Sequence, residues 1–274
     1  MIGIFDSGIG GLSVFREIYR LLPRQRYAYY ADSAHCPYGG KSREYVENRA
    51  RIITDFLLEK GADIIVVACN TATAAAIATL RSEYSDPKNE EVRQKVLRLT
   101  SGRRDHIKFI GMEPAVKPAS EHTETGIIGV LATAGTLSGN KYKTTRETFA
   151  KGVTVVEHVG DGFVELVEKG LTGGSEAEAT VRNSIMPLLK SGADTIVLGC
   201  THYPFLSETI SKIAGPDIKI IDPAPAVARH LVEVMNEEGI PETEIQKTEL
   251  PDISLYTSGN LQTLKTAFSR LAIV

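Results

Sequence analysis

The sequence predicts an α/β protein built of two pseudo-symmetric, doubly wound units, each with a parallel central sheet. Three observations predict this fold class: short apolar segments alternate with longer amphipathic ones, the chain repeats itself, and polar side chains follow the apolar segments. The apolar runs are continuous rather than alternating, as is typical of parallel strands covered on both faces. Their alternation with helical segments is typical of α/β proteins.

The expected strands, in chain order, are Ile2–Phe5, Tyr27–Tyr30, Ile64–Val67, Phe109–Met112, Ile127–Leu131, Val153–Val156, Thr195–Leu198 and Ile218–Ile221. Helical periodicity is clearest over Gly11–Leu22, Ser42–Lys60, Thr71–Tyr84 and Ala177–Lys190. The polar segment Tyr84–His106 interrupts the alternation. We expect it to be a surface excursion with a short helix and assign it no chemistry.

The internal repeat is the more informative observation. The segment GADIIVVAC at 61–69 recurs as GADTIVLGC at 192–200, with six of nine positions identical, the cysteine included. IGIFDSG at 2–8 is echoed by IGVLATA at 128–134, and IKFIGMEPA at 107–115 by IKIIDPA at 218–224. The echoes keep the same order in both halves, so each unit is expected to carry one cysteine at the same structural place.

The repeat also sets the expected domain boundaries. Residues 1–112 together with 223–274 form the first unit, and residues 113–222 form the second. Ligands of open α/β sheets bind outside the carboxyl ends of the strands, where the next helix presents free N–H groups and positive potential. If the units face each other, Cys69 and Cys200 point into one shared cleft, which is the expected active site.

Composition bounds the function classes. The net charge of −3 gives no electrostatic reason to expect nucleic acid or an anionic membrane as a partner. The start MIGIFDSG has no basic region before an apolar run, and no apolar stretch approaches the ~20 residues that a spanning helix needs. Three cysteines without CxxC spacing do not make a disulfide framework. A reduced, cytoplasmic, soluble protein is expected; its oligomeric state stays open, although homodimers are common.

Two opposed cysteines predict cofactor-independent racemisation of an amino acid. Inverting a stereocentre by proton transfer requires a base on one face of the carbon and an acid on the other. A thiolate and a thiol supply both, and their roles exchange with the direction of reaction. A free thiol with a pKa near ~8.5 is only a few per cent thiolate at neutral pH, and a helix N-terminus lowers that pKa. Positioned proton transfer contributes on the order of 10²–10⁴-fold, so a dry, preorganised pocket must supply the remainder.

A free cysteine is more commonly a small buried hydrophobic residue. The duplication at strand ends favours chemistry here, because each thiol has polar neighbours that a core residue does not need: Asn70, Thr71, Thr201 and His202. Asp6 has a structural alternative as the cap of the helix beginning near Gly11. The echo of Asp6 is Ala132, which shows that folding does not require an acid at this place.

Several motifs, in order, resemble those of the glutamate racemase family. They are Asp6-Ser7-Gly8, Asp32-Ser33 with Pro37-Tyr38-Gly39, Ala68-Cys69-Asn70-Thr71-Ala72, Glu113-Pro114-Ala115, Gly199-Cys200-Thr201-His202-Tyr203-Pro204 and Tyr256-Thr-Ser-Gly259. The resemblance covers nearly the whole chain. It implies interconversion of L- and D-glutamate without pyridoxal phosphate or metal, and supply of D-glutamate for peptidoglycan.

The resemblance also implies residue roles. Cys69 would act on the D-enantiomer with Asp6 assisting it, and Cys200 on the L-enantiomer with His202 and Glu168 assisting it. The substrate would be bound by hydroxyls, an amide and backbone N–H groups, which hold carboxylates without a buried countercharge. These residues are Asp6, Ser7, Tyr38, Gly39, Asn70, Thr71, Thr133, Thr136, Thr201 and His202.

The chain departs from the family pattern in three places. Val159-Gly-Asp-Gly-Phe163 stands where the family typically has a cysteine and a proline, which weakens the assignment of the nearby Glu168, otherwise an ordinary exposed helical acid. Cys36 lies next to the Pro-Tyr-Gly motif, where no thiol is expected and no role is assigned. The Tyr84–His106 excursion is longer than usual for the family.

Other functions fit part of the sequence. Gly8-Ile-Gly10-Gly11 after the first strand, with Asp32 ending the second, partly fits a dinucleotide site, but Ser13 stands where the third glycine is needed. Zinc binding would use His35, Cys36, Cys69, Cys200 and His202, whose spacing is not that of a usual site. A non-catalytic binding protein and an aspartate or other amino-acid racemase of the same architecture complete the alternatives.

Overall fold

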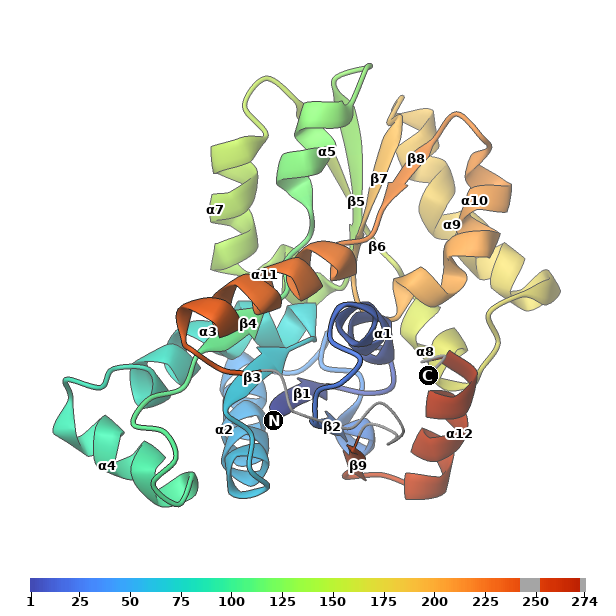
Figure 1. Ribbon diagram of the computed structural model, residues 1–274. Helices are drawn as coiled ribbons and strands as arrows, with labels where there is room; N and C mark the ends of the chain where they lie inside the picture. The colour runs from blue at the N-terminus through green and yellow to red at the C-terminus, as the bar shows by residue number, and fades with distance from the viewer. Residues whose placement is uncertain (242–251, 272–274) are drawn as a thin grey trace. The chain divides into compact units, whose positions relative to one another are not determined.

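The computed structural model describes residues 1–241 and 252–271 and divides the chain into two compact units (Figure 1). Residues 1–112 and 224–274 belong to the first unit, and residues 113–223 to the second. The predicted first unit extends over residues 242–251 and 272–274, which lie outside the described residues.

The first unit has a five-stranded parallel sheet of order β4-β3-β1-β2-β9. Its strands are β1 Ile2–Asp6, β2 Tyr27–Ala31, β3 Ile64–Val67, β4 Phe109–Gly111 and β9 Ile253–Thr257. Its helices are α1 Leu12–Leu21, the 3₁₀ turn η1 Ser33–His35, α2 Arg43–Glu59, α3 Asn70–Tyr84, α4 Glu90–Leu99, α11 Ala224–Glu237 and α12 Leu261–Leu271. Helices α2 and α3 pack together beside the sheet and bury a continuous apolar core with it.

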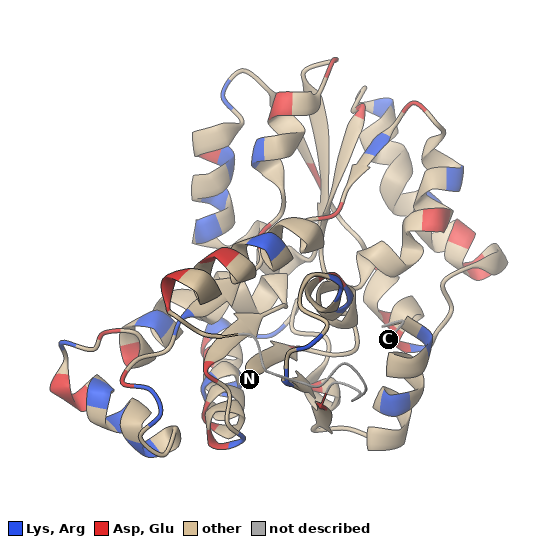
Figure 2. Cartoon of the chain, in the orientation of Figure 1, with Lys and Arg blue, Asp and Glu red and all other residues tan. Residues whose placement is uncertain are grey.

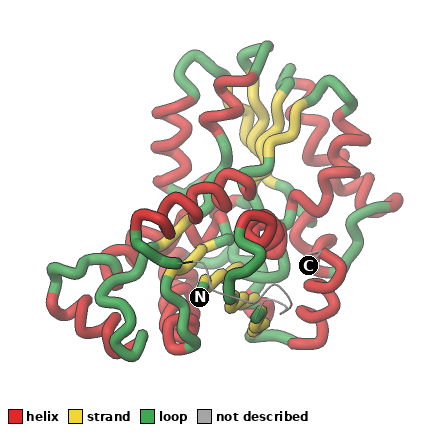
Figure 3. The backbone as a smooth tube through the Cα atoms, viewed as in Figure 1, coloured by secondary structure: helices red, strands yellow, loops and turns green. Residues whose placement is uncertain are grey.

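The second unit has a four-stranded parallel sheet of order β8-β7-β5-β6. Its strands are β5 Ile127–Ala132, β6 Thr154–Val159, β7 Thr195–Gly199 and β8 Lys219–Ile221. Its helices are α5 Val116–His122, α6 Ala134–Leu137, α7 Asn140–Phe149, α8 Phe163–Glu168, α9 Gly174–Lys190, the 3₁₀ turn η2 Tyr203–Leu206 and α10 Ser207–Ala214. Helices α5 and α7 lie on one side of this sheet, and α9 and α10 on the other (Figures 1 and 3).

The two sheets share one strand order, because β4-β3-β1-β2 and β8-β7-β5-β6 match position by position. The sequence echoes pair β1 with β5, β3 with β7 and β4 with β8. This agreement confirms the predicted fold class of parallel sheets in an α/β arrangement. Lys, Arg, Asp and Glu lie mostly on helices and loops, while the strands are nearly free of charge (Figure 2). Among the residues described, no helix is both long and apolar enough to cross a membrane.

One strand differs from the sequence-based expectation, while the segment that interrupts the alternation contains the helix expected there. The edge strand β9 was not predicted, because its sequence ISLYT mixes polar and apolar residues instead of forming a continuous apolar run. It is half-buried along its length, as an edge strand with one solvated side should be. The excursion Tyr84–His106 contains a helix of ten residues, α4, whose N-cap Asn89 accepts N–H bonds from Glu91 and Val92.

Asp194, the repeated acid that precedes β7, ties that strand to the start of β5. Its carboxylate accepts hydrogen bonds from the Thr123 hydroxyl at 2.7 Å and from the N–H groups of Glu124 at 2.6 Å and Thr125 at 2.8 Å. Burial alone would raise the pKa of Asp194, but these bonds outweigh it and lower the pKa to about 2. The ionised carboxylate therefore stabilises the entry of two neighbouring strands.

We predict that Asp194→Asn destabilises the second unit by ~1 kcal/mol at pH 7, a value that allows for solvent screening at this partly exposed site. A depressed pKa in the folded protein gives stability that is present above the unfolded pKa and is lost as pH falls through the folded one. The difference in free energy of unfolding between wild type and variant should therefore become smaller as the pH falls from about 4 to about 2. Urea unfolding at about pH 4 and at about pH 2 measures this difference. The control is Asp217→Asn, at an exposed position. An equal gap at both pH values would contradict the assignment.

Candidate active site

In the first unit, the carboxyl ends of the adjacent strands β1 and β3 bring the DSG and CNT segments together. Phe5 pairs with Val67 in the parallel register, and the chain leaves the sheet one or two residues later on both strands. The Cys69 sulfur lies 3.7 Å from the Ser7 hydroxyl oxygen. The strand order reverses between β1 and β3, because β2 lies on the far side of β1. Such a reversal is where open α/β sheets bind their ligands.

Cys69 is the N-cap of α3, a helix of 15 residues. Its sulfur accepts the N–H of Ala72 at 3.4 Å, so the thiol faces the positive end of the helix. The side chain is buried, with 5% of its surface exposed. Sulfur at a helix N-cap is poorly suited to a purely apolar role, because it lies against free N–H groups that favour negative charge.

Asp6 ends β1 and is fully buried. Its carboxylate accepts the N–H of Gly8 at 3.0 Å. The N-cap position of α1 is held by Gly11, five residues after Asp6. A Cβ on Gly11 would lie 2.6 Å from the Asp6 Cβ, so glycine is needed for the turn to close over the acid. Asp6 therefore lies in the tight turn between β1 and α1.

Asn70, the first residue of α3, is 97% buried, yet neither atom of its amide group finds a hydrogen-bond partner within the described chain. Leaving a buried amide unpaired costs on the order of 1–3 kcal/mol for each group. An amide can both donate and accept, so it would satisfy a carboxylate or an ammonium group of a ligand. Thr71 beside it is also buried.

The Tyr38 side chain turns into the protein. It is 1% exposed, and its hydroxyl donates to Asp32 at 2.5 Å. Burial and the negative charge of Asp32 raise the pKa of Tyr38 well above its usual value. The hydroxyl is thus occupied, whereas Gly39 lies at the half-exposed surface of the same loop. Asp32, the ribose ligand required by the dinucleotide alternative, is also occupied, by Tyr38 and by Arg49.

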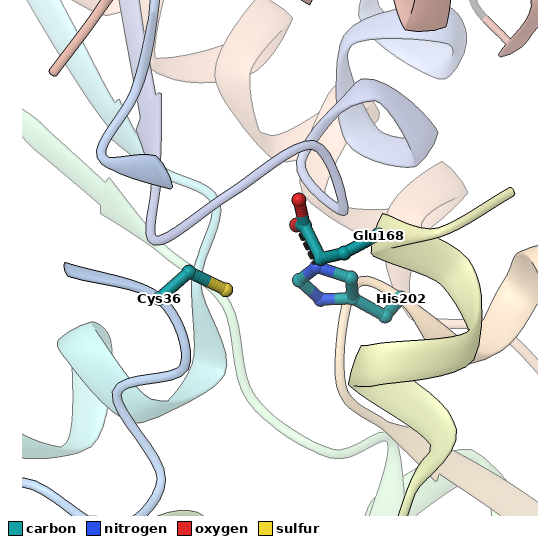
Figure 4. A group of neighbouring side chains, drawn as sticks. All are labelled: Cys36, Glu168 and His202. Carbon is teal, nitrogen blue, oxygen red and sulfur yellow. Dashed lines mark hydrogen bonds and ion pairs between the residues drawn. The ribbon is translucent and has the colours of Figure 1, made fainter. Parts of the chain in front are cut away.

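In the second unit, β7 ends at Gly199 and delivers Cys200, Thr201 and His202, all at most 7% exposed. The Cys200 sulfur lies 3.8 Å from Nδ1 of His202. Nε2 of the same ring lies 2.7 Å from a carboxylate oxygen of Glu168, and Figure 4 shows this pair. Glu168 is the last residue of α8 and a quarter of its side chain is exposed. If Nε2 carries the proton donated to Glu168, Nδ1 is the acceptor that faces the thiol.

Tyr203 connects the two elements that carry this group. Its ring is fully buried and packs edge-on against Phe163, the first residue of α8, with 5.0 Å between ring centroids. Its hydroxyl donates to the carbonyl oxygen of Gly160 at 3.4 Å, and a Cβ on Gly160 would lie 2.6 Å from that hydroxyl. Burial, and then the charge of Cys200, raise the pKa of Tyr203. The glycine in the departing Val159–Phe163 segment is therefore what admits Tyr203 here.

The remaining predicted residues lie at the ends of β5 and β7. Thr133 follows β5 and caps α6, accepting the N–H of Thr136 at 3.3 Å, and the two threonine hydroxyls lie 3.0 Å apart. Thr201 is buried beside Cys200. The strand order reverses between β5 and β7 as it does between β1 and β3. In each unit, the predicted residues that follow the first and third strands thus lie at its own reversal of strand order, whereas Tyr38, Gly39 and Glu168 come from the segments after the second strands.

Comparison with known proteins identifies the family of this two-unit α/β protein. The Asp/Glu/Hydantoin racemase family matches residues 105–231. A glutamate racemase from Methylococcus capsulatus is 43% identical over 257 residues, which cover 94% of this chain and 86% of that protein. The crystal structure of a glutamate racemase isoform from Bacillus anthracis is 32% identical, with a TM-score of 0.81 over 98% of this chain and 92% of that one.

The structure of Escherichia coli glutamate racemase in complex with L-glutamate and the activator UDP-MurNAc-Ala is 28% identical, with a TM-score of 0.79 over 98% of this chain and 94% of that one. The chain belongs to the glutamate racemase family. This membership confirms the resemblance that the motifs indicated, and it disfavours the dinucleotide alternative.

Proposed function

We propose that this chain interconverts L-glutamate and D-glutamate by proton transfer at the α carbon, with Cys69 and Cys200 acting on opposite faces of one bound substrate. The observation that carries the proposal is the placement of each thiol after the third strand of its unit, beside the first strand, at the reversal of strand order. Chemistry on both faces of one carbon needs two such groups. Homologues named glutamate racemase supply the substrate class.

Starting from L-glutamate, the Cys200 thiolate removes the α-proton and becomes a thiol. The Cys69 thiol then delivers its own proton to the other face and becomes a thiolate, which leaves D-glutamate. The reverse reaction begins from this second protonation state, so no external acid, base or oxidant is consumed. In the proposal His202, held by Glu168, receives the thiol proton of Cys200, and Asp6 has the corresponding role for Cys69.

Substrate recognition in this proposal uses the residues gathered at the two reversals of strand order. The unpaired amide of Asn70 is the strongest support, because a bound carboxylate or ammonium group removes the cost of its burial. Ser7, Thr71, Thr133, Thr136, Thr201 and the Tyr38–Gly39 segment complete the proposed contacts. Since the Tyr38 hydroxyl is engaged by Asp32, this segment is proposed to bind through its backbone.

We place the reaction in the cytoplasm, where the free thiols at Cys36, Cys69 and Cys200 would stay reduced. The D-glutamate formed would supply peptidoglycan synthesis, as the family resemblance implies. A homodimer is the proposed assembly because such dimers are common. Sedimentation of the purified protein tests it.

The test of function is incubation of chelator-treated protein with pure L-glutamate in D₂O, following optical rotation and deuterium at the α carbon. Loss of rotation together with deuteration is the expected result. Unchanged rotation with glutamate but racemisation of aspartate would transfer the proposal to aspartate. No reaction with either substrate would refute it. Absorbance above the aromatic band would indicate a bound flavin and would favour the dinucleotide alternative.

A further inference from the structure

Asp32 is a fully buried carboxylate for which the proposed reaction has no use. It follows β2 and lies four residues before the Cys36-Pro-Tyr-Gly39 loop. Arg49 of α2 donates to it from two nitrogens, Nε at 2.9 Å and Nη2 at 2.8 Å, while Tyr38 donates from its hydroxyl at 2.5 Å. A bidentate guanidinium fixes direction as well as distance.

These contacts keep Asp32 charged. Burial would raise its pKa, but the hydrogen bonds from Arg49, Tyr38 and Ser258 outweigh burial and lower the pKa. The bond to Asp32 likewise raises the pKa of Arg49, whose side chain is only 16% exposed. A buried ion pair whose other hydrogen-bonding positions are also occupied favours one arrangement of the segments that it joins.

The segments joined are far apart in the sequence. Ser258 follows the edge strand β9, in which Thr257 pairs with Ala31 of β2. Its hydroxyl accepts the N–H of Ala34 at 3.1 Å. Asp32 thus ties together the end of β2, the start of η1, helix α2 and the end of β9. This connection accounts for two motifs that the proposed chemistry leaves unused, Asp32-Ser33 and Tyr256–Gly259.

The loop held in this way and the thiol of the same unit share one apolar core. Tyr38 and Cys69 belong to one cluster of buried residues. The charge of Cys69 contributes, after burial and after Asp32, to the raised pKa of Tyr38. Moving the Asp32–Arg49 pair would therefore move the Tyr38–Gly39 segment relative to Cys69.

We propose that Asp32 and Arg49 are positioning residues, which hold the Tyr38–Gly39 segment against Cys69 in the arrangement that binds a carboxylate of the substrate. The inference rests on the proposed function for the identity of that substrate. The pair touches no reacting atom and acts through the segment alone. Its loss should therefore weaken substrate binding more than it slows proton transfer.

The test is Arg49→Lys, which keeps the charge but loses the bidentate fork. Its matched control is Arg51→Lys on the same helix, because Arg51 donates from Nε to both oxygens of Glu83 at 2.9 and 3.0 Å, away from the loop. We expect KM for both enantiomers to rise about 10-fold in Arg49→Lys with kcat within about 3-fold, and both constants to stay within about 2-fold in Arg51→Lys. Equal KM values in the two variants, or a loss confined to kcat, would overturn the proposal.

A second readout does not depend on activity. Cys36 is half-buried in the anchored loop, so its alkylation by iodoacetamide, followed by peptide mass spectrometry, reports how firmly the loop is held. We expect at least about a 3-fold faster reaction in Arg49→Lys than in Arg51→Lys. An unchanged alkylation rate would contradict the positioning role of Asp32 and Arg49, whether or not the chain is active on glutamate. Inactivity on glutamate would refute only the proposed function.

If Arg49→Lys does not fold, Ser258→Ala decides the question, because it removes a partly exposed contact without unpairing a buried charge. A smaller rise in KM, about 3-fold, is then expected with unchanged kcat. Wild-type KM together with a wild-type rate of Cys36 alkylation in that variant would refute the anchor.

Discussion

Cys200→Ala is expected to lower racemisation of glutamate by about 10³-fold or more in both directions, and Cys69→Ala to do the same. In the proposed mechanism, each substitution removes the base on one face of the carbon and the acid on that face in the reverse reaction. The equilibrium between mirror-image substrates is unity, so kcat/KM for the two directions must fall by one common factor. Polarimetry with each pure enantiomer measures the loss.

Serine variants separate a chemical defect from a folding defect. Cys200→Ser keeps nearly the same volume and leaves Cys69 at its helix N-cap. D-glutamate should then still exchange its α-proton with D₂O without inversion, while L-glutamate should not. Cys69→Ser should show the opposite preference. Exchange of both enantiomers in either variant, or full turnover in an alanine variant, would contradict the two-base mechanism. Circular dichroism and a melting curve show whether each variant is folded.

The fold was predictable because its determinants are local and repeated. Buried strands such as Ile64–Val67 are continuous apolar runs, and the repeat carries the same strand order into both units. The edge strand β9 was not predicted because one side of it contacts solvent, so that its sequence is not a continuous apolar run. Periodicity detects burial on two faces more readily than pairing at an edge.

The candidate site was predictable where it depends on strand ends and much less where it depends on long-range packing. From the sequence alone, Arg49 would be taken for a solvated charge on a helix. It lies three residues after the buried Val46 and next to the buried Ala50, and this spacing could have indicated that it faces inward. Its acceptor Asp32 is 17 residues earlier in the chain. No local sequence pattern predicts the contact between Arg49 and Asp32, or the contact between Tyr203 and Gly160.

The contact of Glu168 with His202 also depends on long-range packing. Its position on a helix, after a segment that departs from the family pattern, by itself indicated no more than an exposed acid, and only the family resemblance implied a role beside His202. The structure places its carboxylate 2.7 Å from His202 because Tyr203 packs on Phe163 and Gly160 and so sets α8 beside the end of β7. A carboxylate at this distance can hold the imidazole in one orientation and stabilise its protonated form.

Glu168→Gln is therefore expected to lower kcat/KM about 10- to 100-fold in both directions. Glutamine keeps an acceptor for His202 but loses the negative charge, which in the proposed mechanism stabilises the imidazolium formed when His202 takes the Cys200 proton. The matched control is Glu165→Gln, one turn earlier on the same helix and exposed to solvent, which should leave both constants within about 2-fold. Equal losses in the two variants would assign the effect to the charge of the helix rather than to His202.

Net rates alone cannot locate the defect, because kcat/KM must change equally in the two directions. Exchange in D₂O can locate it. If Glu168 acts through His202 on Cys200, deprotonation of D-glutamate by Cys69 is spared in Glu168→Gln, and exchange without inversion of D-glutamate should rise relative to its racemisation. L-glutamate should show no such excess. A parallel loss of exchange and racemisation from D-glutamate would mean that Glu168 does not act on the Cys200 side of the reaction.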